Sequence, residues 1–268
     1  TYPLYGNLIE RLFGPAPLPF SLLTMVTDST SINHSWINSA AGHYAVADEQ
    51  SAQYFHDAGL PAERVHVTGF PVDPGFCCGR PDRAERQLPT PFRILYLPTT
   101  AAGSVVRTLA GLSEFIAAAQ FEVQLTVVLG RHEKRLRKRV QHAVPAGSEV
   151  LGWTGRMAEL LSSSHLLISK AGGASVQEAL ASGCPMLVDY VVPGQEEGNA
   201  ERLVGLGAGA VAPTPDRLAD YLSEITASGC AWLGMRRAAI KSGSAGAALR
   251  VADLCLTLEE MASRVPTS

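Results

Sequence analysis

The sequence predicts an α/β protein built on doubly wound parallel sheets. Short apolar runs alternate with segments of helical periodicity along most of the chain, which is the pattern of successive βαβ units. Runs such as LTVVL (125–129) and HLLIS (165–169) are apolar on both faces, as expected for strands of a parallel sheet covered by helices on either side. A segment rich in Pro, Gly and charge, GFPVDPGFCCGRPDRAERQLPTPF (69–92), interrupts the alternation and predicts a boundary between two parts.

Each predicted strand is a short apolar run, and each predicted helix has the 3.6-residue period of an amphipathic segment. The predicted strands are, in order, residues 22–26, 43–47, 65–68, 92–97, 124–129, 165–169, 185–190 and 208–212. The predicted helices between them are residues 49–58, 104–119, 132–142, 156–163, 175–182 and 196–206. From Asp216 onward the sequence predicts only helix.

The two parts are predicted to be unequal. Residues 1–72 contain three predicted strands and one predicted helix, which is little for an independent doubly wound domain. We interpret them as the C-terminal part of an N-terminal Rossmann-like domain whose front half is missing here or comes from a partner subunit. Residues 73–91 are the predicted linker, residues 92–244 a complete Rossmann-like domain, and residues 245–268 a C-terminal helix.

Composition argues against several classes of function. With 268 residues and a formal net charge of −3, the chain gives no reason to expect nucleic acid as a partner. Its five cysteines form no C-x-x-C pair and no zinc-type spacing, so we expect reduced thiols, a cytoplasmic location and no metal site. No apolar run reaches the roughly 18–20 residues of a membrane span. H-E-x-x-H, G-x-S-x-G and Walker A motifs are absent.

Two glycines follow the predicted strand 165–169, at the point where ligands bind in a doubly wound sheet. Gly172 and Gly173 allow a close approach of the backbone, and the N–H groups of the next helix attract an anion, which Lys170 and Ser175 would also contact. Glu178, one turn further on, suits the vicinal hydroxyls of a ribose. Together these groups indicate a nucleotide site, although the pair of glycines alone also fits an ordinary helix start.

A second polar turn, PGQEEGN (193–199), follows the next predicted strand. Gln195, Glu196 and Asn199 open a helix beside the first turn, and amide and carboxylate groups that converge at a strand end suit the hydroxyls of a sugar. The alternative is a capped helix start, because Glu is favoured in a first turn. Two such turns on consecutive strands favour the binding site.

Weaker signals lie in the same predicted domain. The small residues 99–103 are typical of a second loop near the phosphates, or of an ordinary turn between a strand and a helix. Arg131 follows another predicted strand and is placed to reach a diphosphate or a base. The turn Gly152-Trp153-Thr154 precedes a helix, where its backbone groups are placed to recognise a base edge. The alternative is a Thr N-cap with a packed Trp153 behind it. The basic run 131–140 is interpreted as a solvated helix face, with contact to anionic lipid as the alternative.

The N-terminal part offers only weak catalytic candidates. Asp28 and His34 follow the predicted strand 22–26. Acidic and imidazole side chains at a strand end suit acid–base chemistry, but a lone histidine is more often structural. No catalytic pair is fixed by the sequence.

The chain resembles a family of lipid-glycosylating enzymes. The stretches VTGFPVDPGF, SKAGGASVQEAL and PGQEEGN, in this order and spacing, are similar to the monogalactosyl- and glucosyl-diacylglycerol synthases of glycosyltransferase family 28, to which the lipid II-forming transferase also belongs. The resemblance covers residues 24 to about 212. It implies a GT-B architecture, in which two Rossmann-like domains face each other across a cleft and the second binds a UDP-sugar.

The resemblance also implies roles for individual residues. Gly172, Gly173 and Ser175 would contact the diphosphate, Glu178 the ribose, and the region of Trp153 the uracil. The implied sugar contacts are Gln195, Glu196 and Asn199. The chain departs from the family at residues 99–103, where the family has a glycine-rich loop, and it has no counterpart of the family's N-terminal half with its histidine base.

The resemblance implies an inverting transferase that moves a hexose from a UDP-sugar to a lipid acceptor such as diacylglycerol. It would need no cofactor beyond the donor substrate and no metal, and would sit in the cytoplasm, peripherally on the inner face of the cell membrane. Two alternatives stay open. The chain is an inactive or subunit-type UDP-sugar-binding half without its own base, or a UDP-sugar epimerase of the same architecture.

Overall fold

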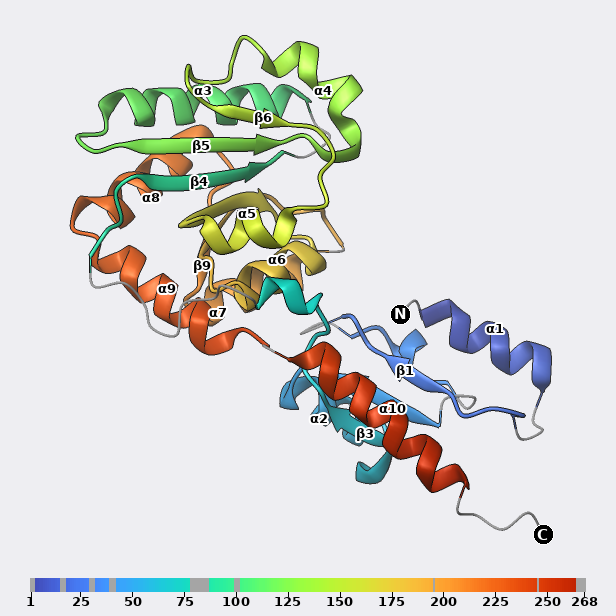
Figure 1. Ribbon diagram of the computed structural model, residues 1–268. Coiled ribbons are helices and arrows are strands. Elements are labelled where there is room, and N and C mark those ends of the chain that lie inside the picture. The colour runs from blue at the N-terminus through green and yellow to red at the C-terminus, as the bar shows by residue number, and fades with distance from the viewer. Residues whose placement is uncertain are drawn as a thin grey trace. The chain divides into compact units, whose positions relative to one another are not determined.

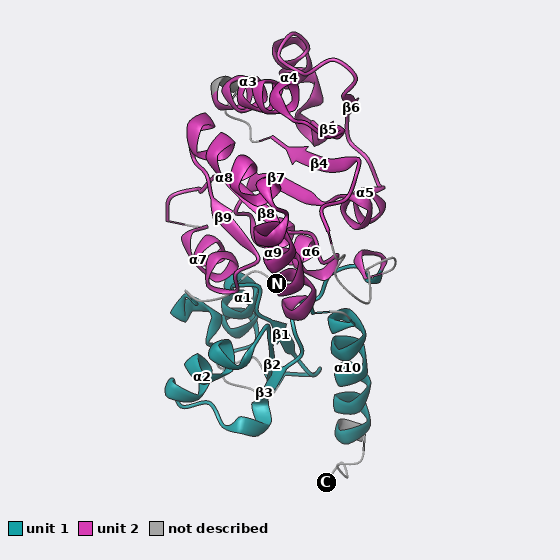
Figure 2. Ribbon diagram, turned by 90° about the vertical axis from the view of Figure 1, so that its left-hand side faces the viewer, with its two compact units in different colours: residues 1–74, 244–268 teal, residues 75–243 magenta. Residues whose placement is uncertain are grey.

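The computed structural model describes residues 3–14, 18–28, 32–38, 42–77, 87–98, 102–194, 196–244 and 246–263. These residues belong to two compact units (Figure 2). Unit 1 comprises residues 1–74 and 244–268, and unit 2 comprises residues 75–243. The C-terminal helix therefore belongs to the same unit as the N-terminal part of the chain.

Unit 2 contains a six-stranded parallel sheet with the order β6-β5-β4-β7-β8-β9. Its strands are β4 (Phe92–Leu97), β5 (Val123–Val128), β6 (Glu149–Leu151), β7 (Leu166–Lys170), β8 (Met186–Tyr190) and β9 (Gly209–Val211). Along the chain, β4 is the first strand of this sheet. The strands β5 and β6 are then added on one side of it, and β7, β8 and β9 on the other side. The direction of winding therefore reverses between β4 and β7, and in such sheets ligands bind beyond the carboxyl ends of the strands at this point.

Helices cover both faces of this sheet (Figure 1). On one face, α3 (Ala102–Ala118) and α8 (Pro215–Ala227) pack against a core that includes Phe92 and Tyr96. On the opposite face lie α5 (Met157–Ser163) and α6 (Gly173–Ala181). Further helices of the unit are α4 (Glu133–Val140), α7 (Glu197–Gly205) and α9 (Cys230–Ser242). The interior is aliphatic and aromatic, so burial of apolar surface stabilises the sheet that holds the strand ends.

Unit 1 is smaller. Its parallel sheet has the order β1-β2-β3, and it packs a compact core around Trp36, Tyr44 and Phe55. The rings of Tyr44 and Phe55 have centroids 4.9 Å apart. The elements of unit 1 are α1 (Pro3–Phe13), β1 (Leu23–Met25), β2 (His43–Val46), α2 (Glu49–Asp57), β3 (Val65–Val67) and α10 (Ala247–Ser263). Arg250 on α10 donates through Nε to the carbonyl oxygen of Thr68, 2.8 Å away.

The predicted fold class is confirmed, with two elements missed. All eight predicted strands form, with small shifts at their ends. The sequence analysis did not predict β6, because three residues are too few for a period to show. It also did not predict α1, whose Gly6 weakens a helical pattern but is needed, since a Cβ there would lie 2.2 Å from the side-chain nitrogen of Asn38. Residues 78–86 of the predicted linker lie outside the described residues. None of the described helices is both long enough and apolar enough to cross a bilayer.

Candidate functional site

A β-bulge lies at the carboxyl ends of β7 and β8, where the two polar turns begin. Ser169 pairs with Val188 and Lys170 pairs with Tyr190, so β8 has one extra residue, Asp189, at this point. A bulge changes the direction of the side chains next to it. Ser169, Lys170 and Tyr190 line one cavity, whereas the carboxylate of Asp189 contacts a residue of the α3-covered face of the sheet. The bulge thus adds the ammonium group of Lys170 to the wall of the cavity.

The first turn leads into α6. Gly172 is the N-cap residue and provides no side-chain hydrogen bond, so no cap side chain occupies the N–H groups at the start of the helix. A Cβ on Gly172 would lie 3.2 Å from Nζ of Lys170, so glycine at this position leaves room for the lysine. An open helix N-terminus beside an ammonium group is an environment that attracts a phosphate.

The second turn holds the first in place. The carboxylate of Glu196 is buried and forms an ion pair with Lys170. Its other oxygen accepts from the main-chain N–H of Val192 at 3.2 Å. Asn199, on α7, donates through Nδ2 to the carbonyl oxygen of Ala171 at 3.1 Å. Glu196 and Asn199 therefore fix the conformation of the glycine turn, and the structure brings the two turns together as the sequence analysis expected.

A cavity of about 520 Å³ opens at this end of the sheet. Its lining residues are Leu97, Pro98, Val128, Leu129, Gly130, His132, Trp153, Thr154, Met157, Ser169, Lys170, Ser175, Glu178, Tyr190 and Val192. Ser175 and Glu178 are three residues apart on α6, so they lie on the same helix face. The cavity therefore combines an apolar floor with a few polar groups, which is the usual composition of a small-molecule site, and its volume is in the usual range.

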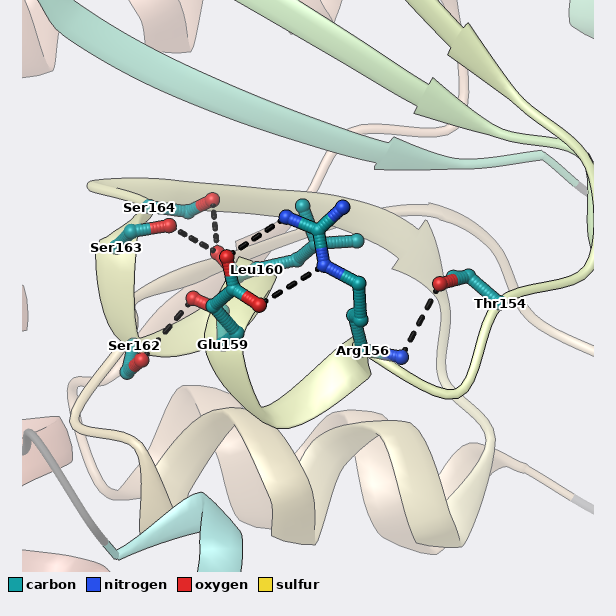
Figure 3. A network of polar contacts seen from close by, with 7 residues as sticks. All are labelled: Thr154, Arg156, Glu159, Leu160, Ser162, Ser163 and Ser164. Carbon is teal, nitrogen blue, oxygen red and sulfur yellow. Dashed lines mark hydrogen bonds and ion pairs between the residues drawn. The ribbon is translucent and has the colours of Figure 1, made fainter.

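The turn before α5, whose polar contacts are drawn in Figure 3, contributes Thr154 to the wall of the cavity. Thr154 accepts through Oγ1 from the main-chain N–H of Arg156 at 3.1 Å. Arg156 in turn pairs with Glu159 through two hydrogen bonds of 2.9 and 2.7 Å. The hydrogen bond from this guanidinium lowers the pKa of Glu159. These contacts hold the start of α5, and hence Thr154, against the cavity, while Trp153 beside it is 68% exposed.

Asp189 and Tyr96 form a buried pair on the α3-covered face of the sheet. The Tyr96 hydroxyl donates to Oδ2 of Asp189 at 3.1 Å, and among the described residues Oδ1 has no hydrogen-bond partner. Burial raises the pKa of Asp189 to about 6, and burial together with the neighbouring carboxylate raises the pKa of Tyr96. Nothing in the sequence distinguishes Asp189, because it lies within an apolar run that is typical of an ordinary buried strand.

The structure brings together most of the predicted donor-binding residues. Trp153, Lys170, Ser175 and Glu178 line the cavity. Gly172, Gly173, Glu196 and Asn199 form the layer directly behind Lys170 and the start of α6. Residues that line the cavity and were not predicted include His132, Met157, Tyr190 and Val192. The apolar members carried no signal in the sequence, because they do not differ from core residues.

Other predicted site residues lie elsewhere. Arg131 is exposed and does not line the cavity, although its neighbours Gly130 and His132 do. Gln195 and residues 99–101 lie outside the described residues. In unit 1, Asp28 accepts a hydrogen bond of 2.6 Å from Nε1 of Trp36, and His34 is exposed. The catalytic roles of Asp28 and His34 stay predictions.

Residues 99–251 match the family model of the glycosyltransferase family 28 C-terminal domain. This match covers more than half of the chain and includes every residue of the cavity wall except Leu97 and Pro98. The chain belongs to glycosyltransferase family 28. The family resemblance given by the sequence motifs is thereby confirmed.

Curated relatives of this family 28 chain include processive diacylglycerol β-glucosyltransferases. That of Staphylococcus carnosus is 28% identical over 227 residues, covering 84% of this chain and 57% of the relative. That of Staphylococcus aureus (strain Newman) is 29% identical over 252 residues, covering 84% of this chain and 64% of the relative. The chain thus spans about three fifths of the length of these relatives.

Solved structures show the same fold as this family 28 chain. MurG of Acinetobacter baumannii has a TM-score of 0.62 at 18% identity, over 93% of this chain and 70% of that chain. The UDP-GlcNAc 2-epimerase of Neisseria meningitidis, solved with UDP-GlcNAc bound, has a TM-score of 0.60 at 16% identity, over 81% of this chain and 62% of that chain. The architecture is therefore of the GT-B type, as the motif resemblance implied.

Proposed function

We propose that this chain carries the donor site of a transferase that moves a hexose from a UDP-sugar to a lipid acceptor such as diacylglycerol. The observation that supports this most is the cavity at the carboxyl ends of β7 and β8, which has Lys170, Glu178 and Ser175, in the first turn of α6, in its wall. The names of the Staphylococcus relatives support the lipid acceptor. The ligand of the Neisseria meningitidis structure supports the nucleotide sugar.

The proposed donor pose follows from charge. The diphosphate lies at the start of α6, where main-chain N–H groups and Lys170 neutralise it. Glu178 accepts hydrogen bonds from the ribose hydroxyls one turn further along the helix. Trp153 and Thr154 border the base, and the polar turn of Glu196 and Asn199 borders the sugar.

The proposed reaction inverts the anomeric carbon. The acceptor hydroxyl oxygen forms a bond to C1 of the hexose from the side opposite to UDP, while the bond from C1 to the phosphate oxygen breaks. The hydroxyl proton passes to a base, for which Asp28 and His34 are the candidates on this chain. Negative charge then grows on the leaving UDP. Donors that are already in place at the start of α6 stabilise this charge without reorganisation.

Calorimetry with UDP tests the donor site. We expect the intact chain to bind UDP and Glu178→Ala to weaken binding about 10- to 100-fold, since a hydrogen bond to a charged group is worth roughly 1.5–3 kcal/mol. Glu201→Ala, which removes an exposed carboxylate from α7, is the matched control and should bind UDP as the wild type does. No UDP binding by the intact chain, or equal affinity of the Glu178→Ala variant, would contradict the proposal.

Two alternative activities predict different products. A donor-binding half without its own base would bind UDP but give neither glycolipid nor free hexose when incubated with UDP-hexose and diacylglycerol. An epimerase, which the fold of the Neisseria meningitidis enzyme brings into consideration, would convert the donor with no acceptor present. NMR of the donor after incubation alone, and radiolabel in the lipid phase after incubation with acceptor, separate the three outcomes.

A further inference from the structure

Helix α4 concentrates positive charge in an otherwise acidic chain. The chain has 22 lysines and arginines and a formal net charge of −3. Six of those cations lie between residues 131 and 139, where Glu133 is the only acidic residue. The six are Arg131, Lys134, Arg135, Arg137, Lys138 and Arg139. Because this segment is strongly positive, the rest of the chain carries a larger negative excess than the total suggests.

The helix presents these cations outward. Leu136 and Val140, four residues apart, are buried in the core of unit 2 and fix the orientation of α4. Arg137 is paired with Glu133 at 2.7 Å. The other five cations, which we call the α4 patch, are exposed and make no ion pair with any described residue. At 100° per residue, Lys134, Arg135 and Lys138 point away from Leu136 and Val140, and Arg139 lies to one side of them.

The α4 patch adjoins the mouth of the cavity. Gly130 and His132, directly before α4, line the cavity. A Cβ on Gly152 would lie 1.9 Å from Oε2 of Glu133, so the first turn of α4 packs against the residue preceding Trp153. Trp153 lines the cavity and is 68% exposed, which rules out the packed position considered from the sequence. An exposed indole therefore follows directly after the residue that packs against the first turn of this cationic helix.

We propose that the α4 patch and Trp153 form a docking surface for the anionic headgroups of a lipid bilayer. The positive charge of the patch favours an anionic partner, and exposed tryptophan, lysine and arginine side chains are typical of membrane–water interfaces. The net negative charge of the rest of the chain helps to orient the molecule, because the densest run of cations in the sequence lies at residues 131–139.

This docking proposal rests on the proposed function, because it assumes that the acceptor is a membrane lipid. A lipid hydroxyl acceptor lies in the plane of the bilayer, and docking through α4 brings the mouth of the donor cavity to that plane. The patch itself binds no donor, so its loss affects partitioning to membranes and leaves UDP affinity unchanged.

Sedimentation of the intact chain with vesicles tests the proposal. We expect binding to phosphatidylcholine vesicles that contain phosphatidylglycerol, little binding to phosphatidylcholine alone, and release by salt, which screens exposed charges. A lysine or arginine near an anionic surface strengthens partitioning about fivefold. The variant K134Q/R135Q/K138Q/R139Q should therefore lose about 100-fold or more in partitioning.

A control variant with the same change in net charge makes this result specific. R93Q/R107Q/R237Q/K241Q removes four exposed cations elsewhere on unit 2 and should bind vesicles nearly as the wild type does. Equal losses in the two variants, unchanged binding of the α4 variant, or wild-type binding that does not depend on phosphatidylglycerol would each overturn the proposal.

Tryptophan fluorescence provides a second readout. Of the three tryptophans, Trp36 and Trp232 are buried, so a blue shift on vesicle binding reports Trp153. Full binding without a shift would show that another surface meets the vesicle, and would also overturn the proposal. Calorimetry with UDP separates the two proposals. Vesicle binding without UDP affinity refutes the donor site alone, and UDP affinity without vesicle binding refutes the docking surface alone.

Discussion

Asp189 is held in the fold at a cost in free energy. Its carboxyl group is buried, one of its oxygens has no hydrogen-bond partner among the described residues, and burial raises its pKa to about 6. The folded state therefore holds the proton more tightly than the unfolded chain, where the pKa is near 3.8. Stability contributed by this group is complete below about pH 4 and is lost as the pH rises to about 6.

Because ionisation of Asp189 lowers the stability of the folded state, the variant Asp189→Asn is predicted to gain stability at high pH. At about pH 8 the variant should be more stable than the wild type by about 1–3 kcal/mol, because a shift of about two pKa units corresponds to roughly 3 kcal/mol and the new amide N–H groups offset part of the gain. Near pH 4 this gain disappears and only the cost of the amide remains, so the variant should be no more stable than the wild type. Urea unfolding at the two pH values provides the measurement, and a gain that does not change with pH would contradict the assignment.

Lys170 and Glu196 are 26 residues apart in sequence and form an ion pair at the junction of the two polar turns. Glu196 is buried, whereas the Lys170 side chain is 42% exposed. Removing the lysine leaves a buried carboxylate without its partner, so Lys170→Met should destabilise the protein by about 2 kcal/mol, less than for a fully buried pair.

The double variant K170M/E196Q tests this coupling. Because no buried charge remains, its free energy of unfolding should be higher than the sum of the two single effects predicts, by about 1 kcal/mol. Additive effects in urea unfolding would show that the pair contributes nothing beyond its two separate side chains.

Among the elements, β9 packs against its neighbours with no space for a side chain at Gly209. A Cβ there would lie 2.2 Å from the carbonyl oxygen of Met186 on β8 and 2.7 Å from Leu203 on α7. Backbone cannot move aside as a flexible side chain can. We therefore expect Gly209→Ala to lower the free energy of unfolding by about 2 kcal/mol or more.

Gly234 provides the matched control. It is exposed within α9, and a Cβ there would meet nothing within 4 Å. Alanine is favoured over glycine in a helix by about 1 kcal/mol, so Gly234→Ala should stabilise the protein. The midpoints of thermal unfolding of the two variants should therefore shift in opposite directions. A shift in the same direction would contradict the claim that β9 has no space for a side chain at Gly209.

The elements also show how far sequence reasoning reaches. Periodicity located β4, β5, β7 and β8, and the rule that ligands bind at strand ends located the site, because these depend on local patterns. The bulge at Asp189 and the ion pair of Lys170 with Glu196 depend on the register of two strands, which no local pattern encodes. The apolar lining residues, such as Met157 and Val192, were missed because they are no different from core residues until the fold exposes them.

For the whole molecule, the division into two units makes a prediction about donor binding. Every residue that lines the cavity belongs to unit 2. If the donor site is as proposed, residues 75–243 expressed alone should bind UDP with a dissociation constant within about threefold of that of the intact chain, a difference of roughly 0.7 kcal/mol. Calorimetry on the two proteins makes the comparison. A loss of affinity in an excised unit whose circular dichroism shows that it is folded would indicate that unit 1 contributes to the nucleotide site.

The order in which the sheet is wound has a consequence for how the protein matures. The cavity draws on segments from Leu97 to Val192, and β4, the first strand of the sheet along the chain, must receive neighbours on both edges before those segments meet. A partly assembled chain therefore offers no cavity to a nucleotide. A ligand that binds there would stabilise only the fully folded unit 2, by mass action, and its concentration in the cell would help to set how much of the protein survives proteolysis.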